Sequence, residues 1–367
     1  MKKKYVLALT VLATSALSTQ MACAQNNVTI YGRINMDIET IKISNPTGGT
    51  SGDVNRVSSN SSRLGFRGSE DLGGGLQAIF QIESSIGPDE GTATFAGRDS
   101  FVGLNGSWGK LRAGIMEDPF KGMGEFTDVY LGTGLADDGT ITALGGGGSG
   151  FIRRQINSIR YDSPTFGGFQ AQLQYGLQKE DPVTPEKSLT IGGAYTLNRL
   201  KLGAVYQEHR NFTPGRKEYA YRLGAKYEFA AFDLRGGYTH VNYDLPAGTV
   251  THDYWTIASG IKVGPNGLIS LKYGWSPNGR GSAPDGTVSP FGSDNARIYK
   301  GPDSGARVYT LGYEHNLSKR TQLYGYYTRI SNDANANYRF GTNGVNNSAT
   351  GPGADPSAFV IGIVHNF

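Results

Sequence analysis

The stretch that looks most like a ligand-binding loop is SRLGFRGSEDLGGGLQAIFQIES, residues 62–84. Arg63 and Arg67 precede an acidic turn and three consecutive glycines, a combination that could hold a phosphate. A glycine cradle for phosphate needs a helix that begins directly after the glycines. Here the following residues alternate between polar and apolar, which predicts a strand. We therefore expect EDLGGG to be a short turn, with Arg63 and Arg67 on one face of the preceding strand.

Residues that could support catalysis or metal binding show no usable spacing. Each of the five histidines stands alone in the sequence: His209, His240, His252, His315 and His365. A metal site needs ligands at short fixed spacings, and a hydrolase nucleophile needs a base and often a G-x-S-x-G motif; the sequence contains neither pattern. We expect no enzyme activity, no cofactor and no metal.

The N-terminus has the features of a secretory signal peptide. Three lysines at positions 2–4 precede a mostly apolar stretch, and Ala-Cys-Ala at positions 22–24 forms a small-x-small cleavage site. We expect residues 1–24 to be removed and residues 25–367 to form a single domain, because no Pro- or Ser-rich linker divides them. Loss of three of the 35 basic residues leaves 32 against 31 acidic ones, a net charge of +1 that does not favour nucleic acid as a partner.

Long segments of the mature chain alternate strictly between apolar and polar residues. In VTIYGRINMDIE (28–39) the isoleucines fall on one face of a strand, and Arg33 and Asp37 fall on the other. The same period of two recurs in 169–178 and 219–229, with Tyr and Phe near the segment ends on the apolar face. Such long alternation suits a tilted strand that crosses a bilayer, and aromatic residues at its ends suit the two membrane interfaces.

The alternating segments predict sixteen strands: 28–40, 62–69, 75–84, 99–106, 109–116, 157–163, 168–178, 188–197, 200–209, 219–229, 231–242, 253–263, 267–276, 306–316, 321–330 and 358–367. Short turns alternate with longer loops, the longer ones being 41–61, 85–98, 117–156, 179–187, 210–218, 243–252, 277–305 and 331–357. An even number of antiparallel strands, with short turns at one end and long loops at the other, predicts an all-β transmembrane barrel of sixteen strands.

Several segments resemble the general porins of Gram-negative bacteria. The resemblance is carried by VTIYGRINMDIE, SRLGFRGSEDLGGGLQAIFQIES, RDSFVGLNGSWGKLRAGI, NSIRYDSPTFGGFQAQLQYG, LGYEHNLSKRTQLYGYY and the final HNF, and it covers essentially the whole mature chain. It implies a homotrimer in the outer membrane, surrounded by membrane lipids and lipopolysaccharide. It also implies short periplasmic turns, long extracellular loops and passive diffusion of small hydrophilic solutes and ions.

The resemblance also implies where the pore narrows. In the family the third long loop folds inward, which here is 117–156. This loop carries the acidic residues Glu117, Asp118, Glu125, Asp128, Asp137 and Asp138. By motif, the basic residues facing it are Arg63, Arg98 and Arg154.

Three further arginines are candidates for the same constriction. Arg67 has the same parity as Arg63 on its strand and should also face the lumen, and Arg33 of the first strand is another candidate. Because Arg153 and Arg154 are adjacent, the arginine assigned by motif to position 154 is ambiguous by one residue. Arginine stays charged at any accessible pH, and a ring of charged side chains gives a wide pore a preference for ions of one sign. We expect a weak anion preference, opposed by the acids of the loop.

Two other functions remain open from the residues alone. One is a pore selective for a sugar or an organic acid, for which tyrosine-rich wall segments such as QLYGYYT would be suitable. The other is a structural or adhesive outer-membrane barrel with a closed pore. A bilayer recording without conductance would favour the second.

Overall fold

The computed structural model describes residues 27–44, 52–130, 134–137, 150–177, 182–289, 299–340 and 351–367. Within them the chain forms one antiparallel sheet. Its strands are β1 (Asn27–Ser44), β2 (Gly52–Ser59), β3 (Arg63–Gly73), β4 (Leu76–Gly87), β5 (Thr92–Thr94), β6 (Ser100–Gly106), β7 (Gly109–Glu117), β8 (Arg154–Asp162), β9 (Phe169–Leu177), β10 (Lys187–Leu197), β11 (Leu200–Arg210), β12 (Lys217–Glu228), β13 (Asp233–Leu245), β14 (Gly248–Val263), β15 (Gly267–Ser276), β16 (Ala306–Asn316), β17 (Thr321–Asn332) and β18 (Asp355–Asn366).

The described residues of the third long loop include three short helices: α1 (Pro119–Gly122), α2 (Gly124–Thr127) and the 3-10 helix η1 (Gly134–Ala136). None of the helices in the ranges given above is long and apolar enough to cross a membrane. The predicted signal peptide, residues 1–24, and Asp138 lie outside the described residues.

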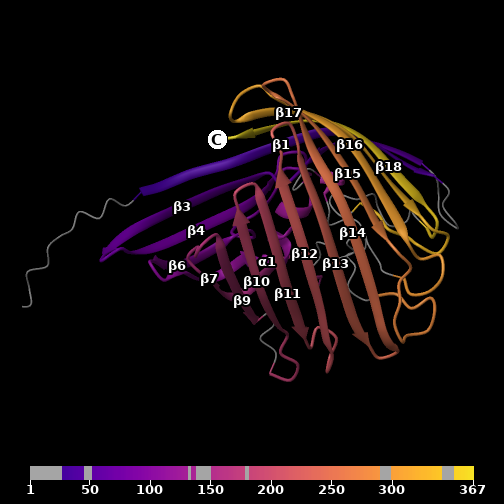
Figure 1. Ribbon diagram of the computed structural model, residues 1–367, viewed down its shortest axis with the longest axis horizontal. Coiled ribbons are helices and arrows are strands. Elements are labelled where there is room, and N and C mark those ends of the chain that lie inside the picture. Colours follow the sequence, from indigo (N-terminus) through magenta and orange to yellow (C-terminus); the bar gives the residue numbers. More distant parts are fainter. Residues whose placement is uncertain are drawn as a thin grey trace, which may run out of the picture.

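The sheet closes on itself as a barrel (Figure 1). β1 pairs with β18 on one edge and with both β2 and β3 on the other, so β2 and β3 share one position around the barrel. β5 and β6 share another, because both pair with β4. The eighteen described strands therefore occupy sixteen positions, which confirms the predicted sixteen-stranded antiparallel barrel.

Side chains explain the break between β2 and β3. Ser61 has a positive φ of 56°, which interrupts the ladder. Ser62 Oγ then accepts from the backbone N–H of Asn35 at 2.9 Å, and Asn60 Nδ2 donates to Asp37 Oδ2 at 2.7 Å. These side-chain contacts and one backbone hydrogen bond, from the Asn60 N–H to the Asn35 carbonyl at 2.9 Å, thus bridge the gap.

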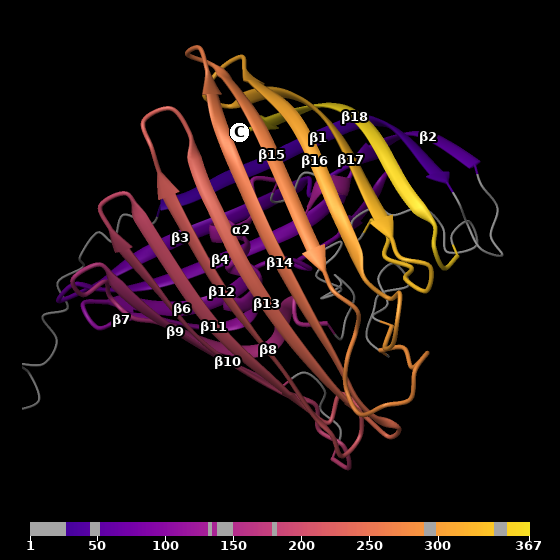
Figure 2. The same cartoon turned by 45° about the vertical axis from the view of Figure 1, so that its right-hand side comes forward.

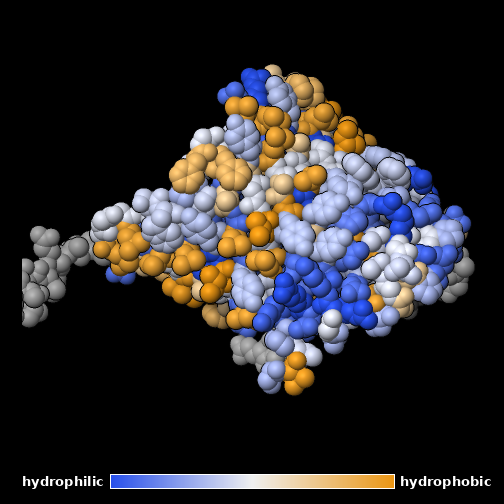
Figure 3. All heavy atoms as spheres, turned by 60° about the horizontal axis from the view of Figure 1, so that its bottom comes forward, coloured by the Kyte–Doolittle hydropathy of each residue, from blue (hydrophilic) through white to orange (hydrophobic). Residues whose placement is uncertain are grey.

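The barrel is apolar outside and polar inside. On β1, Ile30 and Ile38 point outward and are 63% and 65% exposed, whereas Asp37 and Glu39 point inward and are buried. On the face seen in Figure 3, hydrophobic residues gather over the left and central part of the surface, and hydrophilic residues gather toward the right and lower centre. A sheet whose outer face is apolar and whose edges are all paired satisfies the requirements of a lipid environment.

The two ends of the barrel differ. Short turns join the strands at one end and longer connections join them at the other, seen at the upper left and lower right of Figure 2. Two predicted loops at the longer end, 41–61 and 85–98, are partly wrong because each contains an additional strand, β2 and β5.

The predicted loop 243–252 is also wrong, because β13 and β14 are joined there by a two-residue turn between Leu245 and Gly248. Tyr243 and Val250 face inward at this end and are fully buried. Inner side chains here pack against folded loops, so the strand is apolar inside and polar outside. That polarity is the reverse of the polarity in the membrane-spanning part. The pattern of apolar outer and polar inner residues therefore stops before the strands themselves end.

Candidate functional site

The third long loop begins with a buried carboxylate. Asp118 caps α1 by accepting from the backbone N–H of Phe120 at 2.7 Å, and Pro119 occupies the first turn. Its other oxygen accepts from Thr190 at 2.6 Å and from Gln155 at 3.0 Å, on the inner faces of β10 and β8. Burial raises the pKa of Asp118, and these hydrogen bonds lower it in part. Asp118 therefore attaches the loop to the wall.

A second attachment lies further along the loop. Asp128 is fully buried and pairs with Lys272 of β15, with 3.3 Å between Nζ and Oδ2. Lys272 also donates to the backbone carbonyl of Ala136. Arg222 Nη2 donates to Thr127 Oγ1 at 2.8 Å. The loop is thus held against β12 to β15 from inside the barrel.

Three glycines provide the space for this contact. Gly203, Gly224 and Gly237 are direct neighbours across β11, β12 and β13. A Cβ on Gly237 would lie 2.4 Å from Cγ2 of Thr127, and one on Gly203 would lie 2.7 Å from the end of Met123. A row without side chains lets α2 approach the inner wall closely.

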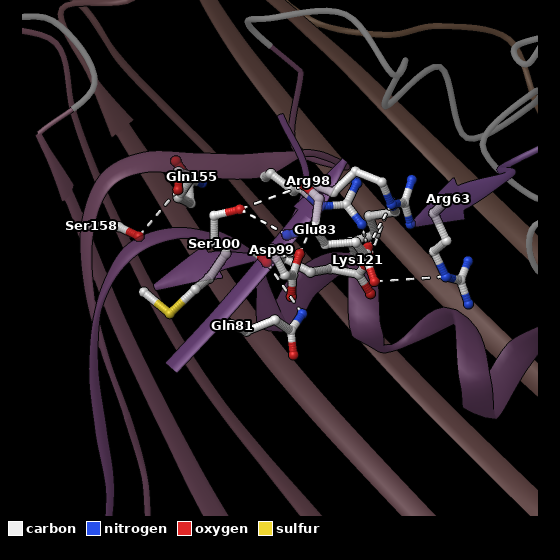
Figure 4. A network of polar contacts seen from close by, with 12 residues as sticks. Arg63, Gln81, Glu83, Arg98, Asp99, Ser100, Lys121, Gln155 and Ser158 are labelled. Carbon is white, nitrogen blue, oxygen red and sulfur yellow. Dashed lines mark hydrogen bonds and ion pairs between the residues drawn. The ribbon is translucent and has the colours of Figure 1, made fainter. Parts of the chain in front are cut away.

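Arginines and carboxylates meet on the side of the lumen opposite this attachment. Arg98 Nε lies 2.5 Å from Glu83 Oε1, and Arg63 Nε lies 3.7 Å from Glu83 Oε2. Arg154 pairs with Asp99 at 2.6 Å and with Glu117 at 3.4 Å. Figure 4 shows Arg63 and Arg98 directed toward the acidic groups that lie between the basic side chains.

Two further arginines extend the group. Arg112 and Arg160 are direct cross-strand neighbours on β7 and β8 and share one carboxylate, Asp162. Arg160 also donates to the backbone carbonyl of Glu117 at 2.7 Å, where the third loop leaves β7. We call Arg63, Arg98, Arg112, Arg154 and Arg160 the arginine cluster.

The arginine cluster carries an excess of positive charge. With Lys121, which pairs with Glu117 at 3.1 Å, it has six cations. Their described ion-pair partners are four carboxylates: Glu83, Asp99, Glu117 and Asp162. Most of these side chains are between a tenth and a third exposed, so their field reaches the water of the lumen.

A cavity of about 510 Å³ separates the arginine cluster from the loop helices. Arg63, Arg98 and Arg154 line one side of it, and Met123 and Glu125 line the other. A solute that passes through this cavity meets a basic wall on one side and a mostly apolar loop with one exposed carboxylate on the other. Such a site can attract and orient ions, and it holds no nucleophile and base pair for catalysis among the residues described.

The predicted constriction residues separate into three groups. Arg63, Arg98, Arg154, Glu117 and Glu125 all line the cavity. Arg33 and Arg67 flank it on the same inner face, Arg33 directly across from Arg63 and Arg67 over the ring of Tyr31. The remaining three, Asp118, Asp128 and Arg153, are buried in contacts that attach the loop, and of these Asp118 also borders the cavity.

Arg153 illustrates why adjacent arginines differ. Its guanidinium lies 4.3 Å from the ring centre of Phe212, and burial lowers its pKa to about 10. Arg154, one residue later, begins β8 and faces the lumen. The one-residue ambiguity in the sequence is therefore resolved by burial, with only Arg154 lining the cavity.

The motif comparison missed Arg112, Arg160, Lys121 and Glu83. A signal for the first two was present, because Arg112 and Arg160 lie at polar positions of alternating segments. Alternation shows on which face of a strand a residue lies, but it does not show at which height in the barrel that residue lies. The sequence also gave no basis for selecting these two from the other polar positions. Across the described residues, no group of three His, Cys, Asp or Glu side chains is arranged to hold a metal ion.

A closed barrel with an apolar exterior, a polar lumen and a loop that narrows the lumen is a membrane diffusion pore. The chain belongs to the Gram-negative porin family, whose sequence profile matches residues 8–336. It is 30% identical over 379 residues to outer membrane porin protein 32 of Delftia acidovorans, covering 100% of both chains. It is 27% identical to the major outer membrane protein P.IB of Neisseria meningitidis serogroup B, covering 87% of this chain and 90% of the relative.

Solved structures agree with this assignment. The anion-selective porin from Comamonas acidovorans superposes with a TM-score of 0.76 at 25% identity, covering 94% of this chain and 100% of that one. A trimer form of OmpT from Vibrio cholerae shares the fold, with a TM-score of 0.65 at 15% identity, covering 93% and 99%. The protein is an outer-membrane porin, a water-filled channel for passive diffusion of small hydrophilic solutes.

Proposed function

We propose that the arginine cluster gives this pore a weak preference for anions and that solutes cross without any chemistry. The observation that carries the proposal is the concentration of cations on one wall of the cavity, where six of them share four carboxylates as described ion-pair partners. Asp118 and Glu125 line the cavity on the loop side and oppose this charge, so the proposed preference is weak. Water-filled pores select ions through such fixed charges rather than through tight binding. The relative of known structure is itself described as anion-selective.

The reversal potential of the purified protein in a planar bilayer with a potassium chloride gradient tests this proposal. We expect the sign that corresponds to chloride passing more easily than potassium. Arg63→Ala should move that potential toward cation selectivity, because Arg63 lines the cavity and Glu83 retains its partner Arg98. A cation-selective wild-type pore would refute the proposed role of the arginine cluster.

We also propose that the protein forms a homotrimer through the outer face of β1 to β6. Among the described residues, the Tyr and Trp side chains that are at least 36% exposed lie on strands between β9 and β17, apart from Trp108 in a turn. The outer face of β1 to β6 instead carries Val, Ile, Leu and Phe, among them Ile30 and Val102. Aromatic girdles mark lipid interfaces, so the wall that lacks Tyr and Trp is the better candidate for subunit contact.

A bulky substitution on each wall tests the trimer. Val102→Trp should lower the temperature at which the trimer dissociates on unheated gels, because overpacking a close contact is destabilising. Ile257→Trp on β14 is the matched control, since fluid lipid accommodates the larger side chain. Equal dissociation temperatures for the two variants would exclude this face from the subunit contact.

The proposed mature protein is residues 25–367, a single barrel domain, with residues 1–24 removed on export. The mass of the purified chain tests the cleavage site directly, since the mature chain would begin at Gln25. Membrane lipids and lipopolysaccharide are its proposed surroundings, and small hydrophilic solutes and ions are what it carries.

A further inference from the structure

A stack of three rings holds the last residues of the third loop at the long-loop end, beyond the membrane-spanning part of the strands. The His209 ring on β11 lies 4.2 Å from the Phe151 ring and 4.1 Å from the Phe212 ring, measured between ring centres, with interplanar angles of 8° and 21°. Phe151 lies in the third loop, three residues before β8, and its ring centre is 5.9 Å from that of Phe120 in α1. The stack therefore connects both arms of the third loop to the barrel wall.

His209 can titrate, yet it is fully buried, and neither of its ring nitrogens has a hydrogen-bond partner among the described residues. Its direct cross-strand neighbour is Glu218 of β12, with 4.0 Å between His209 Nδ1 and Glu218 Oε2, which is longer than a hydrogen bond. Glu218 is also buried, and its other oxygen accepts from Thr213 Oγ1 at 2.9 Å. A buried imidazole and a buried carboxyl group thus face each other inside the barrel.

The surroundings of the stack disfavour a charge on His209. The titratable and charged groups around it are Asp118 and Arg153 of the third loop, Glu186, Arg216, Glu218, Tyr243 and Asp244. Burial, and the charge of Arg153 against the Phe212 ring, lower the pKa of His209 well below its ordinary value. Burial raises the pKa of Glu218 to about 8. Near neutral pH the packed stack therefore holds a neutral His209 beside a mostly protonated Glu218.

Counting protons gives the pH at which the stack weakens. If the loop is released, both side chains reach water and titrate at their ordinary pKa values, 6.5 for His209 and 4.5 for Glu218. Between about pH 4.5 and pH 6.5 the packed and released pairs each hold about one proton, so pH has little effect. Below about pH 4.5 the released pair holds two protons and the packed pair one, so acid favours release. Above about pH 6.5 the released pair holds none, and rising pH also weakens the packed state, up to the raised pKa of Glu218.

We propose that the stack of Phe151, His209 and Phe212 is an acid-sensitive attachment of the third loop, and that protonation of His209 releases the loop from the wall. An imidazolium between the two phenyl rings would be buried beside Arg153. Glu218 would be neutral in acid and would offer it no counter-charge. A released loop moves within the lumen and interrupts the current. The ligand of this device is the proton, and the proposal does not depend on the ion preference of the arginine cluster.

Single-channel recording while the pH is lowered from about 6 to about 3 tests the proposal. In wild type the ratio of interrupted to open time should rise about tenfold per pH unit below about pH 4.5, because release takes up one proton. His209→Phe keeps a stack of three rings and cannot be protonated, so its channel should stay open over the same range. Other carboxylates of the lumen also titrate in acid, so the difference between wild type and variant is decisive. An equal acid response of the two channels would overturn the proposal.

Glu218→Gln should move the acid response in the opposite direction. The packed pair then holds no proton, whereas a released His209 takes one up below its ordinary pKa of 6.5. The interruptions should therefore begin about two pH units higher than in wild type. This variant also decides the question if His209→Phe does not fold. An onset at the same pH as in wild type would overturn the proposal.

A matched control makes the same replacement away from the loop. His315 of β16 lies at the short-turn end and contacts Tyr313, so His315→Phe should leave the acid response of the channel as in wild type. Loss of the response in this control as well would show that the stack is not its source.

Two further measurements separate the possible explanations. Hydrogen exchange of residues 150–156, compared at the same acid pH, should be faster in wild type than in His209→Phe. Equal exchange would show that the channel closes without release of the loop and would contradict the proposal. The reversal potential at about pH 6 should be the same in wild type and both variants, because none of the substitutions lies in the arginine cluster. A failure of the acid-sensitive attachment is therefore distinguishable from a failure of the proposed anion preference.

Discussion

Replacing Arg98 and Arg154 together by glutamine should change the selectivity of the pore from anions to cations. Arg98 pairs with Glu83, and Arg154 pairs with Asp99 and Glu117. Their loss removes two positive charges and leaves the carboxylates in the cavity with fewer partners. The reversal potential in a potassium chloride gradient measures the change, and we expect its sign to invert.

The size of the effect follows from Coulomb's law. A unit charge about 7 Å from a passing ion changes the energy of that ion by about 0.6 kcal/mol in water. Chloride and potassium shift in opposite directions, so each arginine alters the ratio of their permeabilities by about sevenfold before salt screening. For the double variant a change on the order of tenfold should remain after screening.

Two controls make this result specific. Lys319→Gln/Arg320→Gln removes the same charge from an exposed turn and should leave the reversal potential unchanged. Glu83→Gln/Asp99→Asn removes the acids instead and should strengthen the anion preference. If both pairs of substitutions in the cavity shift the potential in the same direction, fixed charge does not set the selectivity.

Lys272→Met should detach part of the third loop from the barrel wall. Lys272 and Asp128 are both buried, and removing one partner of a buried ion pair typically costs about 3–5 kcal/mol. The barrel is held by its closed ladder, so we expect the cost to fall on the loop. Single-channel recordings should show frequent flickering and a conductance different from that of wild type, with the proposed trimer still present on unheated gels.

The double variant Lys272→Met/Asp128→Asn tests the cause. An asparagine oxygen can still accept from the backbone N–H of Tyr130, the contact that Asp128 makes at 3.0 Å, and it carries no buried charge. Quiet channels in the double variant would identify the buried charge as the cause of the flickering. Flickering that persists equally in the double variant would instead assign it to the lost contact between Lys272 and Ala136.

Strand positions and their inner and outer faces could be predicted from the sequence where the barrel crosses the membrane. There the outer side meets lipid and the inner side meets water, so each strand alternates, as in residues 28–39. At the loop end the rule failed, because Tyr243 and Val250 point inward into packed loops. The physical reason is that alternation reports the surroundings of a strand, and those surroundings change along the barrel.

For the site, the residue types indicated the available chemistry, but they did not indicate which side chains would be buried. Arg63, Arg98 and Arg154 were found by motif, and the structure brings all three to one cavity. The structure alone decided that Asp118 and Asp128 attach the loop, because their partners come from strands far along the chain, such as Thr190 and Lys272. Charge belongs to the residue type, whereas burial and pairing arise only when distant strands close into one wall.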